Sequence, residues 1–190
     1  VFGTAIPPDF TTLTAAVTAL NSRIMTCAVS FTLLDSLYPA ETYPIIIQPN
    51  GGASATNTLT IKPGPGINPS FTGSAATALL ILNGADWVTI DGANTVGGTT
   101  RNTTFANTNV STTSAVIWGQ SIGTNDPATN NTLKNLNVVG NASTTTLVGI
   151  GFGSSTYSYD WDWADGSPYN SGGGDTSNGM GLDTGASAWN

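Results

Sequence analysis

The sequence predicts an all-β fold, a parallel β-helix in which short strands stack turn upon turn behind an N-terminal helix. Apolar runs of one type recur at 58–63, 78–84 and 86–92, and each ends in a polar residue, Gly or Pro. The runs follow one another too closely for a helix to lie between them, which is typical of a coiled β-ladder. Such a ladder is mostly scaffold, so we expect function on its faces and ends.

The spacing of the runs indicates a coil with three sides. Ile61 and Ile90 are 29 residues apart, and the apolar run 79–82 lies between them, which suits one turn built from a few short strands and corners. A β-sandwich is the competing fold, because it also has short strands at regular intervals. The continuous apolar runs at 45–47 and 79–82 favour parallel strands over the clean alternation of an antiparallel sandwich.

One helix is predicted, over about residues 10–22, after an extended lead-in at 1–9. Asp9 or Thr11 can cap its start, and Asn21-Ser22 can end it. Because this helix precedes all the strands, we expect it to close the end of the stack rather than act only as a core helix. Its apolar residues fall at helical spacing: Phe10, Leu13, Val17 and Leu20.

The strands are predicted from the apolar runs, and the connections from Gly, Pro and Asn. Phe71-Thr72-Gly73 is expected to form a corner and Asn83-Gly84 a turn. Strands are expected at 28–34, 43–49, 58–62, 78–82, 87–90, 103–105, 115–118, 132–139 and 147–152. Asn tolerates the left-handed backbone of a tight corner, and stacked Asn side chains can hydrogen-bond along a ladder. It recurs at expected corners: Asn83, Asn107, Asn135 and Asn137.

The charge content is low and the balance is acidic. Charged residues make up 8% of the chain, and the net charge is −7, whereas about 25% is typical of soluble domains. The four cations are scattered, so no basic face for nucleic acid or an anionic membrane is expected. No apolar run is long enough for membrane insertion. A surface of Thr, Ser, Asn and Gly indicates an extracellular protein, and a start at Val1 fits either a processed chain or a trimmed one.

The C-terminal segment differs in composition from the rest, so we divide the chain into a capped β-helix at 1–153 and a loop-like or inter-subunit segment at 154–190. The segment is rich in Gly, Ser, Asp and Trp and lacks a strand period. If it is extended, an aromatic row lies on one of its faces. We expect the aromatic residues to contact another copy, their own stack, or sugar rings: Tyr157, Tyr159, Trp161, Trp163 and, further on, Trp189.

Three aspartates of the same segment invite comparison with calcium loops. Asp160, Asp162 and Asp165 miss the spacing of the helix-loop-helix calcium motif, and Ser171 stands where that motif needs Glu. A single oxygen-rich loop can bind calcium weakly, but a solvated acidic loop is the expected outcome. We therefore expect no cofactor.

Several segments resemble the first rungs of right-handed parallel β-helix repeat domains, which occur in large secreted, adhesin-like surface proteins of environmental bacteria. The resemblance covers about residues 1–153. It implies a right-handed coil and a structural or adhesive role at a cell surface, and implies little about activity. The family continues through many more rungs, and the segment after 153 departs from its pattern. The likeness rests on these segments: 12–17, 20–21, 43–45, 52–63, 82–92 and 99–102.

The chain contains few residues of the types that usually carry out catalysis. The chain has no His, which removes Ser–His–Asp triads and most transition-metal sites. Cys27 stands alone in an apolar run, so we expect a buried structural thiol rather than a nucleophile. Asp86 and Asp91 are expected on one strand at an odd offset, hence on opposite faces, which does not suit the paired carboxylates of a glycosidase. Arg101 and Lys134 are the candidates for the base of a polysaccharide lyase.

The sequence hypothesis is a non-catalytic extracellular structural protein, a self-assembling subunit of a surface filament or layer. Its expected partners are copies of itself, because one end of the stack is capped and the other is expected to be open. One alternative is a carbohydrate-binding adhesin module in which Trp161 and Trp163 stack on surface glycans. The other alternative is a polysaccharide lyase-like enzyme.

Overall fold

The computed structural model describes residues 10–123 and 126–154. In this part of the chain, one helix, α1 (Leu13–Asn21), precedes eleven short strands. The strands are β1 (Val29–Leu33), β2 (Ile45–Ile47), β3 (Leu59–Pro63), β4 (Ser70–Gly73), β5 (Leu80–Asn83), β6 (Val88–Asp91), β7 (Thr103–Asn107), β8 (Ala115–Ser121), β9 (Thr132–Lys134), β10 (Leu136–Val139) and β11 (Val148–Ser154).

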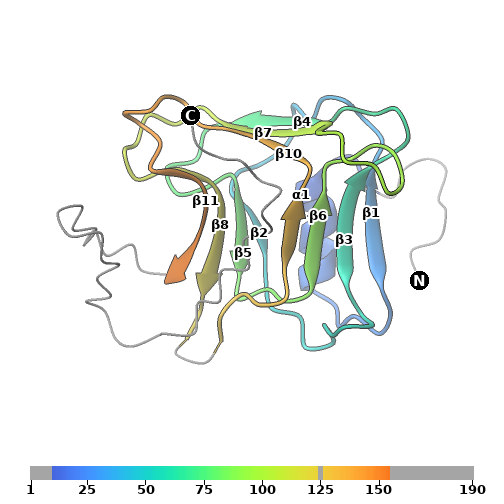
Figure 1. Cartoon of the computed structure of the whole chain (residues 1–190). Coiled ribbons are helices and arrows are strands. Elements are labelled where there is room, and N and C mark those ends of the chain that lie inside the picture. Colours follow the sequence, from blue (N-terminus) through green and yellow to red (C-terminus); the bar gives the residue numbers. More distant parts are fainter. Residues whose placement is uncertain (1–9, 124–125, 155–190) are drawn as a thin grey trace.

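The strands form three parallel sheets, which are the three sides of a β-solenoid (Figure 1). The sheet orders are β1-β3-β6-β9, β4-β7-β10 and β2-β5-β8-β11. Each turn of the solenoid is called a coil below, and the structure has four coils. Coils two to four place one strand in each sheet. In the first coil an isolated bridge between Leu37 and Ser70 stands in place of a strand of the second sheet. The predicted parallel β-helix is confirmed, and the competing sandwich is wrong.

The strands pair in register, so like side chains form columns along the core. Ile45, Leu80 and Ile117 lie above one another on successive coils, and each is almost fully buried. A second column is aromatic: Phe71 stacks on Phe105 with 4.9 Å between ring centroids. Burying one such side chain stabilises the fold by about 1.5–3 kcal/mol. The narrow core is therefore built from repeated contacts between neighbouring coils.

Helix α1 closes the N-terminal end, as predicted. Its apolar face is buried against the first coil, through Leu13, Ala16, Val17 and Leu20. The side chain of Asn21 meets the free edge of β2, because its Nδ2 donates to Ile46 O at 2.8 Å and its Oδ1 accepts from Gln48 N at 3.1 Å. An unpaired strand edge is thus satisfied by a helical side chain. The N-cap is Thr12, whose side chain accepts from Ala15 N, and not Asp9 or Thr11.

Two segments differ from the sequence expectation. Residues 71–73 were expected to form a corner, but Ser70–Gly73 is strand β4, because pairing with β7 and burial of Phe71 outweigh the turn signal of Gly73. The expected single strand 132–139 is two strands. Asn135 separates them with φ 56°, so the chain turns from the first sheet into the second at this residue.

Of the four asparagines expected at left-handed corners, Asn135 alone has a positive φ. Asn83, Asn107 and Asn137 lie within strands. Asn83 instead forms the expected ladder of amides between coils: its Nδ2 donates to Gln48 Oε1 at 2.6 Å, and its Oδ1 accepts from Gln120 Nε2. The ladder thus joins one of the expected asparagines to glutamines of the two neighbouring coils, and three of the four asparagines do not have the left-handed backbone that was expected at corners.

Candidate functional site

The carboxylates that the sequence raised as catalytic candidates are structural. Asp86 does not share a strand with Asp91, because β6 begins at Val88, after Trp87 with φ 59°. The Asp86 carboxylate accepts from both N and Oγ1 of Thr129, each at 2.6 Å. It thus ties the third coil to the fourth. The prediction that Asp86 and Asp91 lie on one strand was therefore wrong, and Oδ1 of Asp86 is bonded to the backbone N–H and the hydroxyl group of Thr129.

Asp91, at the other end of β6, also links the third coil to the fourth. Its Oδ1 accepts from Ala93 N at 3.1 Å and from Asn135 Nδ2 at 2.8 Å, and its Oδ2 lies 3.3 Å from Lys134 Nζ. Partial burial raises the pKa of Asp91, but the hydrogen bonds from Asn135 and Ala93 and the charge of Lys134 outweigh it, and the net pKa is lowered. Lys134, a candidate lyase base, is therefore held in an ion pair.

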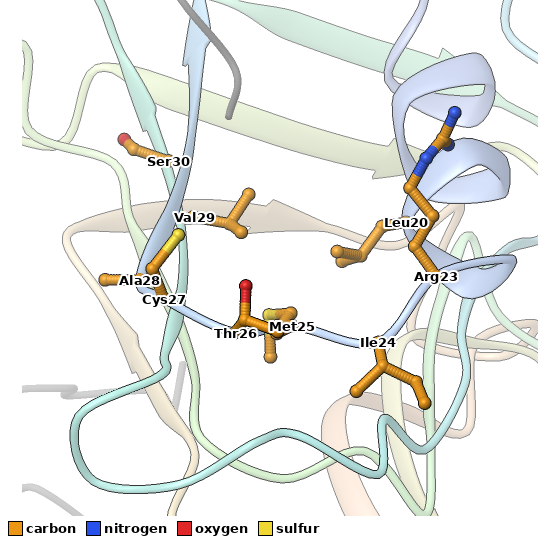
Figure 2. Close-up of a pocket in the computed structure, with 9 residues that line it drawn as sticks. All are labelled: Leu20, Arg23, Ile24, Met25, Thr26, Cys27, Ala28, Val29 and Ser30. Carbon is orange, nitrogen blue, oxygen red and sulfur yellow. The ribbon is translucent and has the colours of Figure 1, made fainter.

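Cys27 is exposed, so the expectation of a buried thiol is wrong. Met25 and Val29 take the buried positions, and the residues between them cross the rim of the first coil. Cys27 lines a cavity of about 420 Å³ between the end of α1 and the start of β1, where Figure 2 shows it on the opposite side from Arg23. The Arg23 guanidinium donates to Ala19 O at 2.6 Å. The lining is largely aliphatic, without polar groups that converge on one point, so we assign it no ligand.

Two tyrosines near this first coil are partly buried. Burial raises the pKa of Tyr43 to about 12, and the negative charge of Glu41 adds to the rise. Burial also raises the pKa of Tyr38, whose ring stacks on Phe71 at 4.6 Å. Both phenols therefore stay neutral at physiological pH and act as packing groups.

The feature that stands apart is the outer face of the fourth coil, formed by β9, β10 and β11 and called the open end below. Several apolar side chains are accessible there, and one of them, Ile150, continues a column that is buried in the preceding coils. Ile150 is 37% exposed, whereas its partner Ile117 on the preceding coil is 0% exposed. Val139 and Leu147 are 47% and 39% exposed. Each strand of the open end is paired on one side only within the described residues.

Aromatic side chains packed over glycine hold the last strand in register. Phe152 of β11 lies over its partner Gly119 of β8, and Trp118 lies over its partner Gly151. A Cβ at either glycine would overlap the ring. Aromatic–glycine pairs across strands pin the register of a sheet. The edge of β11 is therefore presented in one defined register. The sequence signal for this arrangement is Gly at alternate positions of 149–153.

The open end lacks the residues that normally protect exposed strand edges. Soluble proteins place charged side chains or Pro on such edges. From Thr132 to Ser154 the chain has no Pro and a single charged residue, Lys134, which pairs with Asp91 behind it. Alternate residues of β11 are Gly, so no bulky outward side chain hinders a neighbouring strand.

The site residues named from the sequence lie in the C-terminal segment. Tyr157, Tyr159, Trp161, Trp163 and Trp189 fall outside the described residues, as do the calcium candidates Asp160, Asp162 and Asp165. Their roles stay predictions. Within the described residues, no group of three or more His, Cys, Asp or Glu side chains is arranged to hold a metal ion.

The chain matches no model of a known protein family, no curated protein and no solved structure. The fold assignment therefore rests on the strand pairing itself. In the described part of the chain, no helix has both the length and the apolar character needed to cross a membrane.

Proposed function

We propose that the chain is a non-catalytic extracellular structural module that assembles with copies of itself through the open end of its solenoid. One observation carries the proposal, the contrast between the two ends. The first coil is sealed by α1 and the side chain of Asn21. The fourth coil presents apolar side chains and strand edges that lack protective charges.

The physical driving force is the same one that holds successive coils together. Covering Val139, Leu147 and Ile150 removes apolar surface from water, which is favourable by about 25 cal/mol per Å². Pairing of backbone N–H and C=O groups along the three edges adds direction and register. The open end therefore favours another β-structure over a small, polar ligand.

A structural role is also supported by the way the polar groups are used. Asp86 and Asp91 each bind backbone N–H groups and a side chain of the next coil, and Lys134 pairs with Asp91. Catalysis requires convergent titratable groups that are available to a substrate. The low charge content and the Thr-, Ser- and Asn-rich surface favour a location outside the cell.

The proposal predicts that lysine at the open end prevents association. In the Val139→Lys/Ile150→Lys double variant, two charges would have to be buried at the contact, and we expect the variant to remain monomeric where the wild type associates. Molar mass by light scattering after size exclusion, measured over a concentration series, checks this.

Val96→Lys is the matched control. It adds the same charge at a residue that is 86% exposed on the connection between β6 and β7 and belongs to none of the strands of the open end, and it should associate as the wild type does. A wild-type chain that has the monomer mass at every concentration would contradict the proposal.

A further inference from the structure

We propose that the open end is occupied by the open end of a second copy, in a closed tail-to-tail dimer with twofold symmetry. This inference rests on the self-assembly proposed above and names its geometry. Two arrangements can cover the open end with another copy. Either the open end of one copy meets the capped end of the next, which repeats without limit, or two open ends meet, which closes at two subunits.

At the capped end, the edge of β2 cannot continue the strand pairing. Ile46 O and Gln48 N, the edge groups of β2 in the first coil, are already bonded to the side chain of Asn21. Nearby, Asn50 accepts from Met25 N and donates to Arg23 O, which fastens the chain that leaves α1. A copy that paired with β2 would have to displace α1 and return its buried apolar face to water.

Charge favours contact between like ends at the open end. In a twofold contact a patch faces a copy of itself, so any net charge on the patch repels. The chain carries −7 overall, but residues 132–154 carry one charge, and this is paired with Asp91. Five acidic residues and no cation lie in 155–190, so most of the net charge of the chain is outside the solenoid. Strands β9, β10 and β11 carry no unpaired charge, and a contact between two copies of these strands brings no unpaired strand charges together.

Strand length and direction agree with the twofold arrangement. A twofold axis across the solenoid axis reverses the direction in which the second copy winds, so strands that meet across the interface run antiparallel. The seven-residue strand β11 then pairs with β11 of the second copy. Strands β9 and β10, which have three and four residues, exchange places and face each other. No strand lacks a partner of similar length.

The exposed thiol Cys27 reports which ends meet. It lies on the rim of the first coil, at the capped end. In the closed dimer both copies of Cys27 are at the far ends of the particle. We expect its rate of reaction with a maleimide to be the same in wild-type dimer and in the monomeric Val139→Lys/Ile150→Lys variant. In a head-to-tail stack the neighbouring copy covers this rim, and the rate would fall several-fold.

The decisive experiment combines this rate with the molar mass of the full-length chain over a concentration series, for wild type, Ile150→Lys and Ile24→Lys. Ile24 is 72% exposed and lines the cavity at the capped end. For the wild type we expect a molar mass that levels off at twice the monomer mass. Ile150→Lys should remain a monomer, and Ile24→Lys should form the same dimer as the wild type. Cys27 should react with the maleimide as fast in the dimer as in the monomer. Continued growth with a protected Cys27 and sensitivity to Ile24→Lys would overturn the dimer and leave self-assembly standing. A monomer at every concentration, as expected if residues 155–190 cover their own open end, would overturn both.

Discussion

At the scale of single residues, the contacts between neighbouring coils explain why certain small or charged residues stand where they do. Gly119 occupies a column of inward-facing positions whose other members, Ile47, Leu82 and Phe152, are apolar and large. The ring of Phe152 fills the space that a side chain at Gly119 would need. Glycine weakens most strands, but at position 119 it is required because Phe152 of the next coil packs over it.

This packing predicts that Gly119→Ala destabilises the fold. The added methyl group would overlap the Phe152 ring, and overpacking of this kind costs about 1–3 kcal/mol. Gly51→Ala is the control, because open space surrounds that position, and it should change the free energy of unfolding by less than about 0.5 kcal/mol. Chemical denaturation of both variants measures the difference. Equal stability of the two variants would mean that the ring does not lie over Gly119.

Asp91 makes the stability of the β6–β9 corner depend on pH. Its pKa is lowered in the folded chain, so its charged form stabilises the fold above the unfolded-state pKa of about 3.9. This contribution is lost as the pH falls through the folded-state pKa. We expect Asp91→Asn to cost about 0.5–1 kcal/mol at neutral pH, the size of a partly exposed ion pair.

The cost of Asp91→Asn should be smaller at about pH 3 than at neutral pH, because acid brings the carboxylate toward its lowered folded-state pKa and begins to remove its charge. Urea unfolding at the two pH values provides the measurement. Lys134→Gln serves as the control, because it removes the ion pair and leaves the hydrogen bonds of Asp91 from Ala93 and Asn135 intact, and its cost should be smaller. A cost of Asp91→Asn that stays constant with pH would show that the charge of Asp91 contributes nothing.

At the scale of elements, α1 shows how a short helix depends on its surroundings. A nine-residue helix is marginal by itself. Here it is held by four buried apolar residues, by Asn21 at its end and by Glu41, whose carboxylate accepts from Thr14 N at 2.9 Å at its start. A carboxylate at a helix N-terminus is also favoured by the helix dipole. The first turn contains no acidic residue of its own, so a residue of the first coil supplies this charge.

The N-cap offers a test that separates two neighbouring threonines. Thr12→Ala removes the side-chain acceptor of Ala15 N and should cost about 1 kcal/mol. Thr11→Ala changes the residue that the sequence suggested as a cap, which is exposed, and should have almost no effect. Thermal or chemical unfolding of the two variants compares them directly. A larger cost for Thr11→Ala would place the start of α1 one residue earlier.

At the scale of the whole molecule, the two ends of the solenoid have opposite chemistry. The capped end carries charged residues such as Arg23 and Glu41, and its strand edge is occupied by a side chain. The strands of the open end carry one charged residue, Lys134, and expose Val139, Leu147 and Ile150 nearby, and aromatic–glycine pairs fix the register of β11. The terminal coil of a solenoid is stabilised only when another surface covers it. The proposed association through the open end rests on this contrast between the two ends.

The sequence by itself determined the fold class, the three-sided coil and the capping helix. These features depend on the local period of apolar residues, and a run such as 79–82 shows that period without knowledge of its neighbours. Only the tertiary structure decided that Cys27 is exposed, that Phe71 is in a strand, that Asp86 binds Thr129 and that Gly119 is covered by Phe152. These outcomes depend on the register between coils that lie some thirty to forty residues apart in the chain, and local composition does not specify that register.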